Sequence, residues 1–266
     1  MKNKWFNLLA LPCLMLLHSQ NSLAVETPVV SMESGDKTIA VLELYTSEGC
    51  SSCPPAEQFL KKITANQDPN ATFIPLSFHV DYWDYIGWED PFADPDFGKR
   101  QRGIAIRNQL NTLYTPQFVF HGKDFRASHN IPEAAGIINN IKPLAKIKIN
   151  AKLDTKKQLD TNIIVSAQSE RSQWYSNIYI AIVENNLTSN ITDGENNGLR
   201  MQHENVVRKF IGPFPLNGKE KLELNKNIAI EKDWDIKNLN LVVFAQDSFS
   251  GVTHQALQVA LGKLAP

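Results

Sequence analysis

Cysteine is scarce in this sequence: the 266 residues include only three, Cys13, Cys50 and Cys53. A closed structural zinc site takes four ligands, and the chain has no second cysteine pair to complete one around Cys50 and Cys53. An excess of positive charge is also missing, because 27 basic residues face 28 acidic ones and the net charge is −1. This balance disfavours binding to nucleic acid or to an anionic membrane surface.

The N-terminal segment has the three parts of a secretion signal. Lys2 and Lys4 supply positive charge, Trp5 to Leu17 form an apolar run, and Ser22-Leu23-Ala24 matches a cleavage site. The run has thirteen residues and contains Pro12, whereas crossing a bilayer takes about 20. We therefore predict a signal peptide over residues 1–24 and a periplasmic or secreted protein, with no stable membrane insertion after cleavage.

Cys13 lies inside this segment and allows a second interpretation, a lipoprotein signal in which Cys13 carries the lipid. Pro12 before it and the apolar stretch after it argue against lipidation. After cleavage at Ala24, the mature chain keeps only Cys50 and Cys53, so each thiol has a single possible partner within the chain. Exported compartments are oxidising, so such a pair either forms a disulfide or exchanges one.

The pattern of apolar residues along the mature chain changes near Pro143. We therefore predict an α/β domain over residues 25–143 and an all-β sandwich domain over residues 144–266. In the first part apolar runs alternate with helical patterns, which favours parallel strands followed by an antiparallel hairpin. Its expected strands are Thr38–Tyr45, Thr72–Val80, Gln117–His121 and Phe125–His129, and its expected helices are Pro54–Ala65, Phe97–Leu110 and Pro132–Ile141.

The second part shows short alternating strands separated by Asn, Gly and Pro, the pattern of a β-sandwich. It contains no cysteine, so a binding, docking or structural module is its default interpretation. Its expected strands are Ala145–Leu153, Leu159–Ala167, Asn177–Glu184, Val206–Ile211, Lys221–Leu224, Leu239–Gln246 and Gln255–Leu261.

Cys50-Ser51-Ser52-Cys53 follows a strand and opens a helix. Unpaired backbone N–H groups and the helix dipole at that position stabilise a thiolate, so the pKa of Cys50 should fall and the thiolate should act as a nucleophile. Cys53, one turn further in, is expected to be shielded and suits a resolving thiol. The alternative is an inert structural disulfide, but closing so small a loop stabilises a protein only weakly.

Two further residues stand out near this motif. Glu43 is the only charge in an apolar strand, so burial should raise its pKa and let it carry a proton, unless it pairs with a lysine or caps a backbone group. Thr115-Pro116 directly precedes a strand. A cis bond there would expose the backbone of Thr115 to a substrate strand, although most X-Pro bonds are trans.

The order of elements, the C-x-x-C at a helix start and Thr115-Pro116 before a core strand together resemble the thioredoxin superfamily. The resemblance implies that Cys50 is the nucleophile, Cys53 the resolving thiol, Pro116 a cis-proline and Glu43 a proton relay. The sequence departs from the superfamily pattern at Ser51-Ser52 and has no tryptophan before Cys50, which leaves the direction of electron flow open.

A narrower resemblance covers nearly the whole mature chain. The segments LELYTSEGCSSCPPAE, HVDYWDYIGWEDPFA, YTPQFVFHG and ENNGLRMQHENVVR resemble those of a secreted bacterial family catalogued as domain of unknown function 1223. This family resemblance implies a thioredoxin-like domain joined to a C-terminal β-domain, and export from a bacterial cell.

An aromatic segment, His79–Phe92, follows the second expected strand. It should lie at the same sheet edge as Cys50, where active sites of open α/β sheets form. Tyr82 and Trp83 could bind a peptide substrate, with Arg100 and Arg102 balancing the nearby acids, or they could simply pack the loop onto the body.

We thus expect an exported thiol-disulfide oxidoreductase without a cofactor, whose partners are exported proteins or one dedicated redox protein. Two alternatives remain. Cys50, Cys53 and His79 form a soft ligand set suited to copper delivery. Alternatively, the sandwich is a binding module with a polar face of His203, Asn205 and Arg208, and the disulfide is structural or regulatory.

Overall fold

The computed structural model describes residues 28–265, so the predicted signal peptide, including Cys13, lies outside the described residues. Its strands are β1 Val29–Glu33, β2 Ala40–Thr46, β3 Phe73–His79, β4 Gln117–Phe120, β5 Lys123–Asp124, β6 Ala145–Leu153, β7 Gln158–Ala167, β8 Ser176–Glu184, β9 Leu187–Asn190, β10 Arg200–His203, β11 Val206–Pro215, β12 Lys221–Ala229, β13 Leu239–Asp247 and β14 Thr253–Ala260. Its α-helices are α1 Cys53–Ala65, α2 Pro95–Arg107, α3 Ile131–Asn139 and α4 Glu170–Tyr175, and its 3-10 helices are η1 Asp81–Ile86, η2 Ser128–Asn130, η3 Ile236–Asn238 and η4 Leu261–Leu264.

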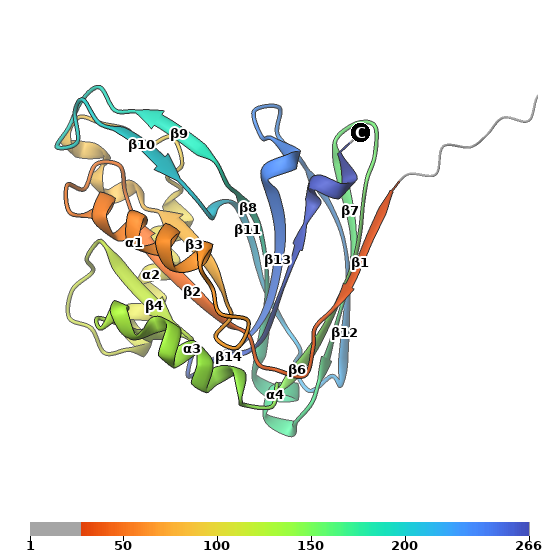
Figure 1. Cartoon of the computed structure of the whole chain (residues 1–266). Helices are drawn as coiled ribbons and strands as arrows, with labels where there is room; N and C mark the ends of the chain where they lie inside the picture. Colours follow the sequence, from red (N-terminus) through yellow and green to blue (C-terminus); the bar gives the residue numbers. More distant parts are fainter. Residues whose placement is uncertain (1–27, 266) are drawn as a thin grey trace, which may run out of the picture.

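These strands form one sheet of eight, in the order β14-β13-β8-β11-β3-β2-β4-β5, and one sheet of four, in the order β1-β6-β7-β12. The remaining pair, β9 and β10, makes a separate ribbon above α1 (Figure 1). Within residues 28–265, no helix combines the length and the apolar character that crossing a lipid bilayer requires.

Strand β2 is the centre of the first half of the chain and is buried along its whole length. It pairs in parallel with β3 and antiparallel with β4, as the alternation of strands and helices predicts. Side chains alternate between its faces. Ala40, Leu42 and Leu44 pack with α1 and α3, whereas Val41 and Tyr45 pack with α2.

The prediction of a strand over Phe125–His129 is wrong. Strand β5 ends at Asp124, and η2 follows at Ser128. The side chain of Gln117 donates a hydrogen bond to the Asp124 carboxylate at 2.8 Å. Phe125 then packs its ring on Phe120, with 5.7 Å between the centroids, so the chain leaves the sheet edge instead of extending it.

The eight-stranded sheet crosses the predicted domain boundary at Pro143. Val206 of β11 lies opposite Ser77 of β3 in a parallel pairing, and the Ser77 N–H donates to the Asn205 carbonyl at 2.7 Å. Strands from before and after Pro143 therefore share one sheet, and β1 from the first half likewise pairs with β6.

The strands expected after Pro143 are all present, and β8 explains how they are packed. Ile178, Ile180 and Ile182 point towards the four-stranded sheet and join the core between the two sheets. Ala181 and Val183 point the other way and join the core around α2. The four-stranded sheet thus covers the β8-β13-β14 part of the large sheet, while helices cover the part that carries β2 (Figure 1).

Candidate functional site

The two cysteines lie where strand β2 hands the chain to α1. Cys53 is the first residue of α1, and Pro54 and Pro55 occupy its first turn, where a missing N–H costs nothing. Both cysteines are free thiols and both are buried, with Cys50 only 1% exposed. The Cys50 sulfur lies 3.3 Å from the Ser52 hydroxyl.

Their environments shift the two thiols in opposite directions. A hydrogen bond from the Cys53 thiol, reinforced by the hydroxyls of Ser52 and Thr115, outweighs burial and lowers the pKa of Cys50 to about 6. Burial and the same contact with Cys50 raise the pKa of Cys53. One sulfur is therefore a thiolate near neutral pH while the other keeps its proton.

Thr115 connects the dithiol to the aromatic segment. The Thr115-Pro116 peptide bond is cis, and the Thr115 hydroxyl is among the groups that lower the pKa of the two thiols. The indole N–H of Trp83 donates to the same hydroxyl at 2.7 Å. Three residues that the sequence singles out, Thr115, Pro116 and Trp83, are thus brought to the cysteines.

The aromatic segment both packs and exposes side chains. A Cβ placed on Gly49 would lie 3.1 Å from the Trp83 Cβ, so Trp83 covers the backbone just before Cys50. Tyr82 donates to Gln101 at 3.0 Å, and burial raises its pKa to about 12. Tyr85 stacks on Trp83 and is 80% exposed, so its ring faces solvent on top of this cover.

A cavity of about 410 Å³ lies beside the motif. Ser52 and Pro55 line one side of it, and Tyr114 and Pro116 belong to the other segment of its wall. The cavity therefore extends from the C-x-x-C segment to the cis-proline.

Glu43 faces away from this cavity, on the side of the sheet that α2 covers. Arg100 donates to both carboxylate oxygens, at 2.8 and 2.7 Å, and the Tyr45 hydroxyl donates at 2.7 Å. None of the described hydrogen bonds of Glu43 reaches a cysteine. Of the two interpretations of Glu43, the structure shows ion pairing, and Arg100 serves this buried partner rather than the acids of the aromatic segment.

The C-terminal half contributes residues that sequence reasoning missed. The side-chain amide of Asn196 donates to the carbonyls of Glu48 and Cys50, at 2.7 and 3.1 Å. The Ser51 N–H donates to the Glu195 carboxylate at 3.0 Å. The β9-β10 loop therefore fixes the backbone of the cysteine segment.

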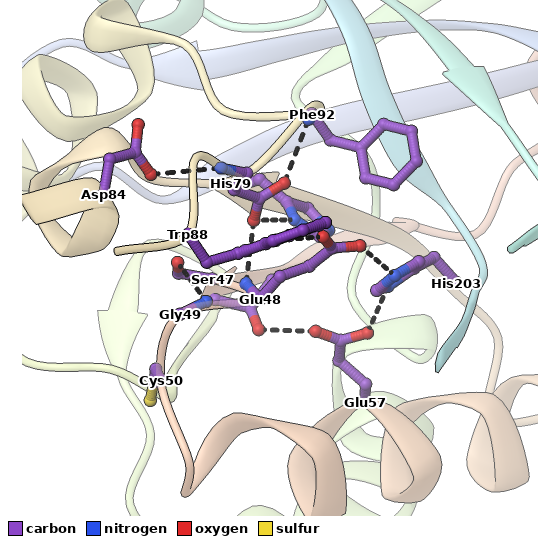
Figure 2. A network of polar contacts seen from close by, with 12 residues as sticks. Ser47, Glu48, Gly49, Cys50, Glu57, His79, Asp84, Trp88, Phe92 and His203 are labelled. Carbon is purple, nitrogen blue, oxygen red and sulfur yellow. Dashed lines mark hydrogen bonds and ion pairs between the residues drawn. The ribbon is translucent and has the colours of Figure 1, made fainter. Parts of the chain in front are cut away.

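A buried polar network lies next to this loop. Figure 2 shows His203 of β10 between the carboxylates of Glu48 and Glu57, which accept its two N–H groups at 2.7 and 2.6 Å. Burial lowers the pKa of His203, but hydrogen bonds to Glu48 and Glu57 outweigh it and raise the pKa to about 10. The Thr46 hydroxyl also donates to Glu57, at 2.7 Å. The sequence singles out His203 only as part of a polar face of the sandwich and gives no role to Glu48 or Glu57. The signal that could have found these two carboxylates is their place in a segment that carries the family resemblance.

His79 belongs to the same network. Its Nδ1 donates to Asp90 at 2.7 Å, while its Nε2 has no hydrogen-bond partner among the described residues. Of the residues that the structure describes, Glu57, His79 and His203 form the group in which three potential metal ligands converge. The predicted copper set of Cys50, Cys53 and His79 is not assembled, because the imidazole of His79 faces Asp90 and His203. The other two residues of the predicted polar face lie elsewhere. Asn205 lies at the β3-β11 junction, and Arg208 pairs with Glu184 at 2.8 Å.

The model of the family described as protein of unknown function DUF1223 matches residues 41–246. The chain belongs to this family. The match runs from β2 to β13, so the DUF1223 region contains the dithiol, the aromatic segment and the buried network together. None of the curated proteins compared with this chain matches it.

The solved structures that resemble this chain include the following two. Protein AGR_C_4864 from Agrobacterium tumefaciens is 21% identical, with a TM-score of 0.61 over 86% of this chain and 96% of that chain. HBP35 of Porphyromonas gingivalis is 15% identical, with a TM-score of 0.66 over 88% of this chain and 78% of that chain. At these identities the similarity concerns the fold of the DUF1223 protein alone.

Proposed function

We propose that this protein is an exported thiol-disulfide oxidoreductase of thioredoxin-like architecture, with Cys50 as nucleophile and Cys53 as resolving thiol. The observation that carries the proposal is the arrangement of two free thiols at the start of α1, with a cis Thr115-Pro116 bond on the cavity that Ser52 also lines. The opposite pKa shifts of the two thiols support the same division of roles.

The exchange proceeds in two steps. The Cys50 thiolate attacks one sulfur of a substrate disulfide, a mixed disulfide forms, and the other substrate sulfur leaves as a thiolate. Cys53 then passes its proton to the substrate thiolate released in the first step and attacks the Cys50 sulfur, which closes the Cys50–Cys53 disulfide and releases the second substrate sulfur as a thiolate. Two electrons pass from the dithiol to the substrate, and the reverse sequence oxidises a substrate dithiol.

Substrate access requires motion, because Cys50 is buried in the structure. The cavity lined by Ser52 and Pro116 supplies a binding surface beside it, and Trp83 and Tyr85 form the adjoining cover. A peptide segment in extended conformation fits a site of this kind, since it could pair with the backbone of Thr115 once the cover opens.

Trapping of a mixed disulfide tests the proposal. Cys53→Ala should accumulate an adduct with oxidised glutathione at Cys50, because no second thiol releases it, and wild-type protein should not. Cys50→Ala is the matched control and should form none while folded. If Cys53→Ala forms no adduct, or if Cys50→Ala forms one as readily, the assigned roles are wrong.

A further inference from the structure

The buried network behind the cysteine segment contains more negative charge than its neighbours compensate. Glu48, Glu57 and Asp90 are all buried or nearly so, with side-chain exposures of 0, 8 and 0%. Their salt bridges among the described residues go only to His79 and His203, and no lysine or arginine joins them. Buried carboxylates are costly unless they are paired or bound to a metal.

A buried nitrogen without a hydrogen-bond partner in residues 28–265, Nε2 of His79, lies in the same network. His79 is fully buried, and its Nε2 has no partner among the described residues although buried polar atoms nearly always have one. Its Nδ1–H donates to Asp90, which fixes the tautomer and leaves a lone pair on Nε2. The rings of His79 and His203 lie 5.1 Å apart, and one potential ligand atom of His79 lies within 4.8 Å of one on His203 and one on Glu57.

We propose that His79, His203 and Glu57 form a binding site for one divalent transition-metal ion of the zinc class, separate from the two cysteines. One ligand atom from each of the three residues lies within 4.8 Å of the others. Tetrahedral zinc with bonds of about 2.0 Å separates its ligand atoms by roughly 3.3 Å, so small side-chain rotations close the site. Two histidines and one glutamate leave a fourth position open for water or another ligand.

The residues around these ligands match the outer sphere of a metal site. Histidines that bind metals usually donate their other N–H to a carboxylate. Asp90 already plays this part for His79 at 2.7 Å. If the ion takes the Nδ1 of His203, which now donates to Glu57, then Glu48 plays the same part by accepting from Nε2. Each histidine would then have a carboxylate partner of its own.

An entry path is also present. A cavity of about 460 Å³ lies between α1 and β10, and Glu57 is one of its lining residues, together with Pro54 and Gln202. An ion could thus reach the carboxylate from solvent. Once bound, it would link α1, which begins with Cys53, to β3 and β10 of two distant segments.

Zinc binding by the full chain with both cysteines replaced tests the site. Cys50→Ser/Cys53→Ser protein, stripped of metal with a chelator, should bind one Zn²⁺ per chain in calorimetric titration and keep it through gel filtration. Bound Co²⁺ should show the absorption of a four-coordinate nitrogen and oxygen site. Absence of stoichiometric binding by this folded protein would overturn the proposal, and because the thiols are gone, that failure would leave the thiol-exchange proposal unaffected.

Two variants in the same background test His79 as a ligand and Asp90 as its outer carboxylate. His79→Gln should weaken zinc binding at least 100-fold, and Asp90→Asn, which removes an outer carboxylate, should weaken it about 10- to 100-fold. His129→Ala replaces an exposed histidine away from the network and should leave binding unchanged. Unchanged affinity in both of the first two variants, with fold checked by circular dichroism, would equally overturn the site; if one variant does not fold, the other decides.

Discussion

At the scale of single residues, Cys50 carries the sharpest prediction. Its pKa of about 6 means that the reduced protein should react with iodoacetamide at a rate that rises around pH 6 and levels off above pH 7. An ordinary thiol, with a pKa of about 8.5, would react faster up to pH 9 and beyond. The burial of Cys50 lowers the rate at every pH but leaves this midpoint in place. Mass spectrometry of the alkylated peptide measures the profile.

Cys53→Ala is the control for that profile. The hydrogen bond from Cys53 is the largest cause of the low pKa, so its removal should move the midpoint upward, towards the ordinary value. A wild-type midpoint near pH 8.5, or one that does not respond to this substitution, would show that Cys50 is not activated by its neighbour.

Substitution of Glu43 distinguishes a structural role of this residue from a catalytic one. Glu43→Gln leaves the buried Arg100 without its counter-charge, so the free energy of unfolding should fall by about 3–5 kcal/mol. If ion pairing is its whole role, the redox potential of the dithiol and the rate at which Cys53 resolves a glutathione adduct should stay unchanged. Urea unfolding and stopped-flow measurement of glutathione release provide the two readouts.

The matched control for this variant is Glu33→Gln, which breaks an exposed pair with Lys146 and should cost less than about 1 kcal/mol. Slower resolution by Cys53 in a folded Glu43→Gln protein would restore the proton-relay interpretation.

The sequence predicts the burial of Glu43 correctly from the apolar strand around it. Its partner could not be predicted, because Arg100 lies 57 residues away and only the packing of α2 against β2 brings the two together.

At the scale of elements, the turn between β4 and β5 packs against the turn between β13 and β14. A Cβ on Gly122 would overlap the carbonyl of Gly251, and the φ of Gly122 is +80°. Gly122→Ala should therefore destabilise the protein by about 3 kcal/mol or more, from left-handed backbone strain and overpacking together. Thermal and urea unfolding measure this change.

Gly35→Ala is the comparison for the Gly122 variant. A Cβ there meets nothing within 4 Å, so stability should change by less than about 0.5 kcal/mol. Equal stability of the two variants would mean that the turns do not hold each other in solution.

Sequence periodicity finds the long elements and misses the short ones. The strand predicted over Ala145–Leu153 has the observed bounds, because apolar and polar residues alternate along it and every second residue of the strand is buried. Strands β9 and β10 are four residues each and carry mostly polar side chains, so periodicity gives no signal for them. They nevertheless supply His203, which the sequence predicts only on a face of the sandwich and not beside α1, and, through their loop, Asn196, which the sequence does not single out.

At the scale of the whole molecule, Pro143 does not separate two independent sheets. A change in local texture can be read from the sequence, but strand pairing between distant segments, such as Val206 with Ser77, depends on contacts that texture does not encode. The ring of Phe78 packs against that of Phe210 with 5.3 Å between centroids, so the core around α2 is also shared. The cysteine segment, fixed by Asn196, depends on the second half in the same way.

Residues 28–143 should therefore fail to fold alone. Without the second half, the edge of β3 and the aromatic core would be open to water, and the Arg100 guanidinium would lose the rings of Tyr179, Phe210 and Phe244 that surround it. Circular dichroism and urea unfolding of this fragment should show no cooperative transition, whereas co-expression with residues 144–266 should restore one, together with the low pKa of Cys50. Cooperative unfolding of the isolated fragment with a Cys50 pKa near 6 would instead mean that the first half is an autonomous redox domain and that the shared sheet is only a docking contact.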